Sequence, residues 1–389
     1  MSIVDRWLLP DGVEDVLPPQ AGRLEAVRRT LLDLYATWGY EYVVPPMVEY
    51  LESLLTGTGR DLDLKTLKVT DLVSGRTMGV RADITPQVAR IDAHSLKHDG
   101  VARLCYAGTV VQSEADGMLE SRTPMKVGAE LFGDASIRGD VEIVCLMIES
   151  MRTLGFETIH VDLGDVSIFR HLVSTFGLSE AQQETLFASV QRKSVQEIQR
   201  QCDAMGLSDG KAKLLVELPL LCGAVEMLDR ARSLYAEFPE LAAILNNLDT
   251  VAQEVAARYP AVDLYFDLGE LRGYAYHTGI VFAAHVDGVS QTVAKGGRYD
   301  HIGAVFGREG RGATGFSVNV LNVAESASIE FEARPTVLVS GEGAGLWEEI
   351  CRLRVDGYTV VESGNAEDYD FCLVQAEGKW QLMRRESHG

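Results

Sequence analysis

Helix-like and strand-like stretches form separate blocks in this chain instead of alternating along it. Strand-like runs dominate residues 40–163 and 262–323, whereas residues 167–259 are rich in Glu, Gln, Ala and Leu and are typical of helices. A chain that built a parallel sheet would alternate its strands with helices. The block arrangement therefore predicts an α+β fold in which helices flank an antiparallel sheet.

Local signals place the first helix and the first long hairpin. Pro18 and Pro19 can open a helix, and apolar residues then recur every three or four positions until Gly39. Residues 104–112 and 126–133 are two strand-like runs joined by a polar loop, a pattern that is typical of neighbouring antiparallel strands. We expect this hairpin to belong to the antiparallel sheet.

The changes of pattern along the chain predict three parts. A core domain would be built from residues 1–166 and 260–328, with residues 167–259 inserted as a helical domain. Residues 334–389 form a separate pattern of short strands with one helix over residues 346–355. This last part is predicted to be a small C-terminal α/β unit.

The composition excludes several classes of protein. The chain has 57 Asp and Glu residues against 36 Lys and Arg, and its net charge of -21 repels nucleic acid backbones at long range. The six cysteines are scattered without a C-x-x-C pair, which argues against a zinc site or a disulfide framework and suits a reducing compartment. No apolar run is long enough to cross a membrane. We therefore expect a cytoplasmic protein without a metal site or a membrane contact.

Five segments resemble, in the same order, motifs of the class II aminoacyl-tRNA synthetases and of the histidyl-tRNA synthetase family in particular. They match that family's G-x-x-D-x-L-P, its motif 1, its L-R-P-E-G-T turn, its V-R-G-L-D-Y segment and its G-G-R-Y-D segment at residues 12–18, 39–49, 80–85, 271–276 and 296–300. Any one match is weak, but the ordered set is specific. The resemblance implies the class II synthetase fold and, through motif 1, a homodimer.

The resemblance also implies a pocket for free L-histidine. In that family the acid and the threonine of the turn bind the ammonium group, an arginine faces the carboxylate, and a carboxylate and an aromatic pair meet the imidazole. The matching histidine-binding residues here are Asp83, Thr85, Lys126, Glu130, Arg272, Tyr276 and His277. Asp83 is one methylene shorter than the usual Glu, Lys126 replaces a frequent Gln, and His277 replaces an aromatic residue.

The cations that would bind ATP are missing from the matching positions. Gln112 stands where the arginine of motif 2 would hold the α-phosphate, and Asn322 replaces the arginine that ends motif 3. The loop that should be basic contains Asp116 and Glu120. Because the loss of one preorganised donor of this kind typically lowers a rate by roughly 10²–10³, we expect no synthetase activity, no catalytic residue and no cofactor.

The C-terminal unit is too short for the anticodon-binding domain of that family, and its acidic residues would repel tRNA. A synthetase-like core without phosphate-binding arginines resembles the family of regulatory subunits of ATP phosphoribosyltransferase. This resemblance implies a non-catalytic partner of the short-form catalytic subunit in the first step of histidine biosynthesis. It also implies that the chain conveys feedback inhibition by histidine and binds no tRNA.

Two other functions remain open from the sequence, an active histidyl-tRNA synthetase-like enzyme and a free-standing histidine-binding regulator of another partner. Simpler roles also remain open for single residues. Arg272 could pair with an internal carboxylate, and His277 could be a buried core residue. Residues 262–282 continue the strand pattern, so Tyr274 and Tyr276 could alternate on a strand and serve only for packing.

Overall fold

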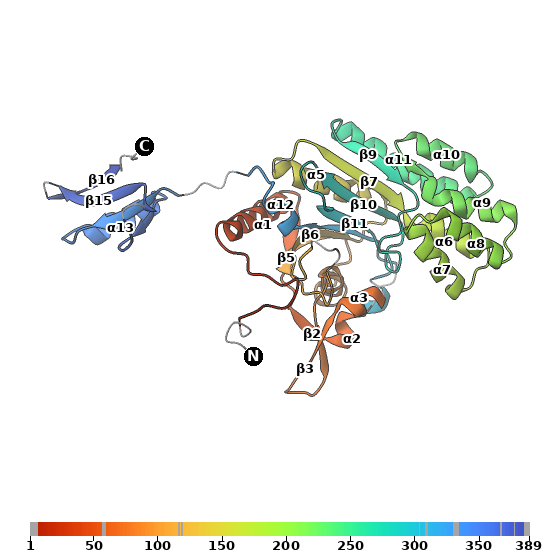
Figure 1. Cartoon of the computed structure of the whole chain (residues 1–389), viewed down its shortest axis with the longest axis horizontal. Helices are drawn as coiled ribbons and strands as arrows, with labels where there is room; N and C mark the ends of the chain where they lie inside the picture. Colours follow the sequence, from red (N-terminus) through yellow and green to blue (C-terminus); the bar gives the residue numbers. More distant parts are fainter. Residues whose placement is uncertain are drawn as a thin grey trace. The chain divides into compact units, whose positions relative to one another are not determined.

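The structure, a computed structural model, falls into two compact units, Met1–Ile329 and Glu330–Gly389 (Figure 1). It describes residues 7–56, 60–115, 117, 120–302, 304–307, 310–329, 334–365, 368–376 and 378–384. None of the helices in these stretches has the length and apolarity that a membrane crossing requires.

The first unit is built on one large sheet. Its neighbouring strands are β1 (Glu41–Tyr42), β5 (Ala102–Thr109), β6 (Met125–Phe132), β12 (Ala313–Asn319), β11 (Ala294–Arg298), β10 (Ile280–Val286), β7 (Ile159–Asp165), β9 (Asp263–Asp267) and β8 (Cys222–Gly223), in that order. The pairs β1–β5 and β7–β9 are parallel, and the other neighbours are antiparallel. The predicted α+β class with a mainly antiparallel sheet is confirmed, and so is the hairpin β5–β6.

Helices pack on one face of this sheet. They are α1 (Gln20–Thr37), α5 (Ile137–Thr153), α11 (Pro239–Arg258) and α12 (Val320–Ala324). Helix α1 follows the two prolines as predicted, and it buries Leu24, Val27 and Leu31. These side chains join Ala129 and Leu131 of β6 in one core. Since successive strand residues point to opposite faces, Glu130 between them points to the other side of the sheet.

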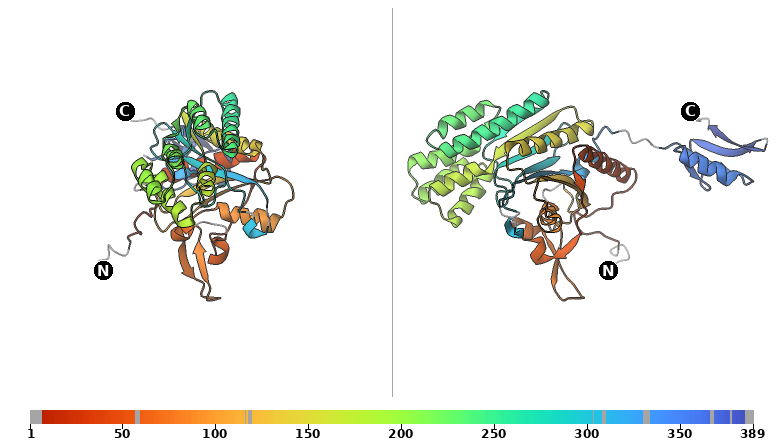
Figure 2. Two further views of the ribbon diagram at one scale, coloured as in Figure 1. Left: turned by 90° about the vertical axis from the view of Figure 1, so that its right-hand side faces the viewer. Right: turned by 180° about the vertical axis from the view of Figure 1, so that it is seen from behind.

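The stretch predicted to be helical lies at one end of the sheet, as seen in Figure 1 and in the right view of Figure 2. It contains α6 (Val166–Thr175), α7 (Glu180–Gln191), α8 (Val195–Ala204), α9 (Asp209–Glu217), α10 (Glu226–Leu234) and α11. Strand β8, which the sequence did not predict, also lies within it. The apolar side chains of the helical stretch belong to the same core as those of the sheet. The division of residues 167–259 into a separate domain therefore stays a prediction.

A second, smaller sheet follows the segment that resembles motif 1. Its strand order is β2 (Val48–Tyr50), β4 (Thr77–Val80) and β3 (Leu67–Thr70). The turn between β3 and β4 is closed by Asp71, whose carboxylate accepts hydrogen bonds from the backbone N–H groups of Val73 and Ser74. Helices α2 (Leu51–Leu54), α3 (Arg60–Lys65) and α4 (Thr85–Arg90) accompany this sheet along the chain.

The second unit has a four-stranded sheet and one helix. The strand order is β14 (Thr359–Val361), β13 (Thr336–Ser340), β15 (Phe371–Ala376) and β16 (Lys379–Arg384), and the helix is α13 (Leu346–Val355). The helix and the first three strands were predicted, whereas β16 was not. Val337, Ile350 and Leu373 form the centre of its own small core.

The prediction that strand pattern continues through residues 262–282 was wrong. Turns at residues 268–276 separate β9 from β10, and Tyr274 and Tyr276 lie in these turns. Gly273 has a φ of +67°, which a strand does not contain. The ring of Tyr274 packs between Phe169 and Phe187 of the helical stretch, a distant contact that the local pattern does not encode.

Candidate functional site

The face of the large sheet opposite α1, α5, α11 and α12, against which α4 packs, carries a row of unusual positions. Glu130 on β6 lies opposite Gly315 on β12, and Gly315 lies opposite Gly297 on β11. A side-chain carbon at Gly315 would lie 1.6 Å from a carboxylate oxygen of Glu130. The glycine therefore makes the space in which the Glu130 side chain lies flat against the sheet.

Glu130 is 1% exposed and is the centre of a hydrogen-bonded cluster. The Thr85 hydroxyl donates to Oε1 at 2.8 Å, and the Tyr106 hydroxyl donates to the same oxygen at 3.2 Å. The Tyr299 hydroxyl donates to Oε2. A carboxylate offers about four acceptor positions, so three donors leave room for one more.

The surroundings of Glu130 oppose its ionisation. Burial raises the pKa of Glu130 to about 8, although the hydrogen bonds from Tyr299 and Thr85 act in the opposite direction. The negative charge of Asp83 adds to the rise. A carboxyl group that is protonated near pH 7 can give its proton to a basic ligand, and the resulting carboxylate then attracts the cation.

Asp83 and Thr85 are held together by a tight turn at the start of α4. The Thr85 backbone N–H donates to Asp83 Oδ1 at 2.8 Å. The Asp83 side chain is half-buried, and its charge acts on Glu130 through space. The structure thus brings these three predicted residues together as an acidic group that suits an ammonium or imidazolium ion.

His277 and Tyr276 lie beside this cluster. His277 is 7% exposed, its Nδ1 is 3.3 Å from the backbone oxygen of Arg298, and its ring lies 6.5 Å from the Tyr299 ring. The Tyr276 ring lies 4.3 Å from the His277 ring at an interplanar angle of 41°, and 43% of the Tyr276 surface is exposed. Burial lowers the pKa of His277 to about 4, so its imidazole is neutral near pH 7. Through Tyr299, which also binds Glu130, these two residues adjoin the acidic group.

Arg272 is oriented by a neighbour on its own turn. Its Nε donates to Glu270 Oε2 at 2.9 Å, and a second guanidinium nitrogen lies 2.8 Å from the same oxygen. Burial opposes the charge, but the ion pair with Glu270 raises the pKa of Arg272 above its usual value. Arg272 does not bind Glu130 directly. It pairs with Glu270, which is the internal carboxylate partner that the sequence left open.

Lys126 shares a strand face with Glu130, because four positions separate them on β6. Its strand neighbours are Gly108 on β5 and Asn319 on β12. A long cationic side chain here lies on the same side of the sheet as the acidic group. Lys126 is thus placed on the same face of the sheet as Glu130.

The positions that lack the phosphate-binding arginines have structural partners. The Gln112 amide donates to the backbone oxygen of Ala82 at 3.4 Å, next to Asp83. The Asn322 amide donates to the backbone oxygen of Thr292 at 3.4 Å. Asp116, in the loop that the sequence marks as acidic, lies outside the described residues.

Arg298, from the G-G-R-Y-D segment, is bound on every side by the protein itself. Its guanidinium donates to both carboxylate oxygens of Asp140, to Asp300 Oδ1 at 2.9 Å, and to the backbone oxygens of Asp134 and Ser136. Its side chain is 9% exposed. Arg298 therefore braces strand β11 and does not offer a free cation to a ligand.

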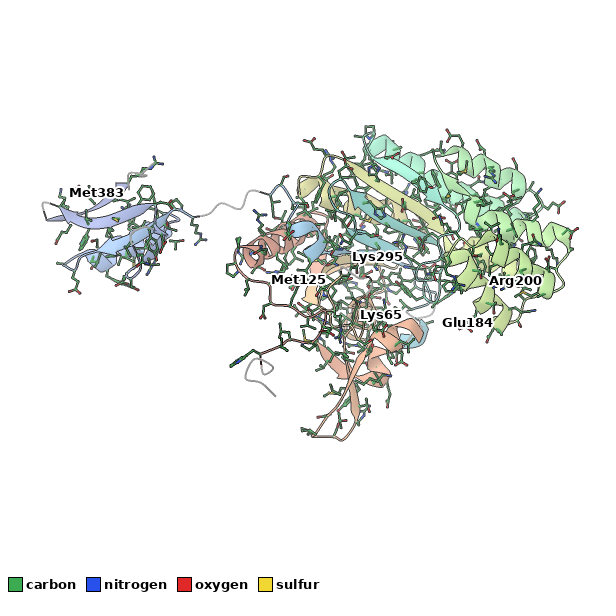
Figure 3. The ribbon with its side chains drawn as sticks, in the orientation of Figure 1. Lys65, Met125, Glu184, Arg200, Lys295 and Met383 are labelled. Carbon is green, nitrogen blue, oxygen red and sulfur yellow. The ribbon has the colours of Figure 1, made fainter. Side chains whose placement is uncertain are left out.

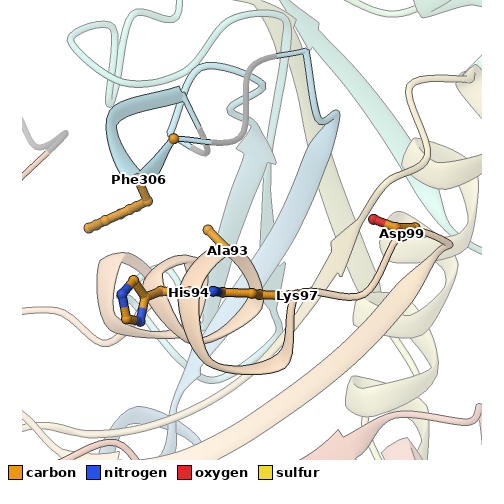
Figure 4. Close-up of a pocket in the computed structure, with 6 residues that line it drawn as sticks. Ala93, His94, Lys97, Asp99 and Phe306 are labelled. Carbon is orange, nitrogen blue, oxygen red and sulfur yellow. The ribbon is translucent and has the colours of Figure 1, made fainter.

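Two surface hollows of the first unit are lined by other residues. One lies between the end of the helical turn at Ala93, His94 and Lys97 and the segment at Phe306 (Figure 4). The other lies beside Phe176 in the helical stretch. Neither contains a residue that the sequence predicted for histidine binding.

Sequence reasoning missed two members of the cluster, Tyr106 and Tyr299. Tyr299 is part of the G-G-R-Y-D segment, and its place in that motif could have identified it as a site residue. Tyr106 faces Gly128 across the β5–β6 hairpin, and a glycine opposite an aromatic residue was the available hint. Both tyrosines are buried, and burial raises their pKa well above the usual value, so they act as neutral donors.

The first unit matches known proteins along almost its whole length. A family model described as histidyl-tRNA synthetase matches residues 12–323. The ATP phosphoribosyltransferase regulatory subunit of Pseudomonas paraeruginosa (strain DSM 24068 / PA7) is 50% identical over 396 residues, which cover 98% of this chain and 99% of the relative.

Solved structures give the same fold. The ATP phosphoribosyltransferase regulatory subunit/histidyl-tRNA synthetase from Bacillus halodurans C has a TM-score of 0.80 at 26% identity, over 91% of this chain and 92% of that one. A chain of the ATP phosphoribosyl transferase (HisG:HisZ) complex from Thermotoga maritima has a TM-score of 0.59 at 17% identity, over 78% of this chain and 98% of that one. The predicted class II synthetase fold is confirmed. From its ordered motifs, its sheet and its identity to relatives, the chain belongs to the family of ATP phosphoribosyltransferase regulatory subunits, which is built on the histidyl-tRNA synthetase domain.

Proposed function

We propose that this chain binds free histidine and conveys it as a feedback signal to a short-form ATP phosphoribosyltransferase catalytic subunit in the cytoplasm. The relatives are named regulatory subunits, and the Thermotoga maritima structure is a complex. We infer that the two proteins act together in the first step of histidine biosynthesis, with this chain as the non-catalytic member. The main support is the buried acidic group around Glu130.

The chemistry of that group suits histidine better than a nucleotide. Glu130 has one acceptor position left for an imidazole N–H, and Asp83 with Thr85 can accept from an ammonium group. Arg272 carries the cation that a carboxylate needs, provided that it shares its guanidinium with Glu270. A triphosphate at this place would meet the uncharged Gln112 and the carboxylate of Asp83, and the negative charge of Asp83 would repel it.

Calorimetric titration of the purified chain with histidine tests the site. We expect binding in wild type and a loss of about 10-fold or more in Arg272→Ala and in Glu130→Gln, since hydrogen bonds to charged groups contribute about 1.5–3 kcal/mol. Arg200→Ala is the matched control, because Arg200 pairs only locally with Glu197 on the exposed side of α8. Equal affinity in all four proteins would remove the assigned site.

Reconstitution with the short-form catalytic subunit tests the regulatory role. Histidine should inhibit the reconstituted complex, and the Glu130→Gln complex should be active but less sensitive. By linkage, the catalytic subunit must change the affinity of this chain for histidine by the factor by which histidine changes subunit binding. A complex that forms and is insensitive to histidine would contradict the feedback role.

The synthetase alternative has a direct test. Histidine-dependent exchange of pyrophosphate into ATP by the purified chain should be absent, because Gln112 and Asn322 replace the cations that bind phosphate. Measurable exchange would restore that alternative. If histidine binds but the chain neither activates nor associates with the catalytic subunit, a regulator of another partner becomes the better explanation. We also expect no tRNA binding, given a net charge of -21.

We further propose a homodimer in which the small sheet takes part. The strand registers place Val48, Tyr50, Val69, Met78 and Val80 on one side of β2–β4–β3. On this side Val48 is 43%, Tyr50 37% and Val69 41% exposed, whereas on the other side α2 packs against Gly79. Exposed apolar side chains gathered on one side of a sheet are typical of interfaces. It directly continues the segment that resembles motif 1.

A further inference from the structure

Arg170 of helix α6 contacts the turn that carries three of the predicted histidine-binding residues. One of its guanidinium nitrogens donates to the backbone oxygens of Tyr274 at 2.8 Å and of His277 at 3.0 Å. The guanidinium also lies 4.8 Å from the centre of the Tyr274 ring. A planar cation over an aromatic face is a favourable contact, so one side chain binds the turn at Tyr274 and at His277.

The same turn is tied to the helical stretch through Tyr274. Its ring lies 5.5 Å from Phe169 of α6 and 5.4 Å from Phe187 of α7. The turn therefore cannot change shape without moving a ring that is packed against two helices.

On its other side the turn reaches the acidic group. A side-chain carbon at Gly273 would lie 2.3 Å from the His277 ring, and one at Gly297 would lie 2.8 Å from it. The ring is thus seated closely against β11, next to Tyr299, which binds Glu130. Arg272, which is half-buried, and Tyr276, which is exposed, belong to the same short segment. Their positions depend on how that segment is held.

We propose that Arg170 is a positioning residue of the histidine site and that it couples occupancy of the site to helices α6 and α7. This inference rests on the proposed function, because it concerns the same ligand. Arg170 fixes the backbone of the turn, so that Arg272 and Tyr276 can meet the ligand without prior rearrangement. Histidine, by ordering the turn, in return stabilises the helices that hold it.

The test compares Arg170→Met, Arg170→Lys and wild type with two readouts. Methionine keeps the apolar stem but loses the donors and the charge, and lysine keeps the charge but not the planar fork. We expect histidine to bind at least 10-fold more weakly to Arg170→Met and at an intermediate level to Arg170→Lys. Histidine should slow amide hydrogen exchange in α6 and α7 of wild type, and this effect should be lost in Arg170→Met at saturating histidine.

Arg200→Met is the matched control, since Arg200 lies on α8 in the same helical stretch (Figure 3) and pairs with Glu197 of its own helix. It should bind histidine as wild type does and keep the exchange effect. If wild type itself does not bind histidine, the proposed function fails. If wild type binds and Arg170→Met shows the same affinity and the same slowing of exchange, the role of Arg170 is overturned. Should Arg170→Met not fold, Arg170→Lys with wild-type affinity and exchange overturns it equally.

Discussion

At the scale of single residues, the site depends on a carboxyl group that the fold keeps from ionising. Glu130 faces Thr85, Tyr106 and Tyr299 as donors and Asp83 as a like charge. None of these four is a cation. A ligand that brings a positive charge would therefore change the protonation of Glu130 as it binds, and histidine binding should depend on pH.

The raised pKa of Glu130 also predicts how stability changes with pH. The folded state holds a proton up to about pH 8, whereas the unfolded chain loses it near pH 4.3. The stabilising contribution is therefore complete below pH 4 and falls as the pH rises to 8, by at most about 1.4 kcal/mol per pH unit. Burial lowers the pKa of His277 to about 4 and raises that of Asp165 to about 6, so these two groups act mainly below pH 6.5.

Denaturant unfolding of wild type and Glu130→Gln between pH 6.5 and 8 measures this effect. Wild type should lose stability across this window, and the variant should show a clearly smaller slope. Parallel curves would mean that Glu130 is already ionised at pH 6.5 and that its surroundings do not oppose its charge.

Gly315→Ala should damage the site more than its size suggests. The new carbon would lie 1.6 Å from the Glu130 carboxylate and 2.8 Å from the backbone oxygen of Ala129. We expect a loss of about 1–3 kcal/mol of unfolding free energy, as for other overpacked positions, and a loss of histidine binding. Gly210→Ala on α9 is the control, because nothing lies within 4 Å of its added carbon, and its stability should not fall. The two variants should differ in both thermal unfolding and calorimetry.

The residues of the candidate site could be predicted from the sequence where a family motif contains them. The resemblance named Asp83, Thr85 and Glu130, and the structure brings them together. An internal carboxylate partner for Arg272 was left open by the sequence, and the structure shows it to be Glu270, two positions away. The sequence could not show that Arg170 holds the turn, since Arg170 and the backbone oxygens that it binds lie 104 and 107 positions apart.

At the scale of elements, most helices and strands followed from periodicity and turn residues. Helix α1, the hairpin β5–β6 and helix α13 lie where the pattern placed them. The errors fall at β8, at the turns after β9 and at β16, whose alternation is obscured by polar residues. In these places tertiary contacts, not local propensity, decide the structure.

The open face of β2–β4–β3 gives a prediction at this scale. Val69→Asp places a charge on the apolar side of edge strand β3 and should shift the chain from dimer to monomer at micromolar concentration. Thr70→Asp is the control, because the next residue on the strand points to the opposite side. Sedimentation velocity separates the two outcomes. If both variants stay dimeric, this face is not the interface between copies.

At the scale of the whole molecule, the chain consists of two units with separate cores. A chain that ends after Ile329 should keep its fold, with a thermal unfolding midpoint of the first unit changed by less than about 2 °C. Its affinity for histidine should stay within about 2-fold of the full chain, because every predicted site residue lies in the first unit. Scanning calorimetry and titration measure both, and a large loss of affinity would show that the second unit takes part in the site.

Arg298 carries a wider implication. Its guanidinium N–H groups donate to partners within the protein. This arginine would therefore stabilise the sheet whether or not a reaction took place at the site. A scaffold can therefore keep the signature segments of an enzyme after the few side chains that handled phosphate have gone. Membership of a family of enzymes and retention of their activity are then separate properties. Only the activity depends on positions such as Gln112 and Asn322.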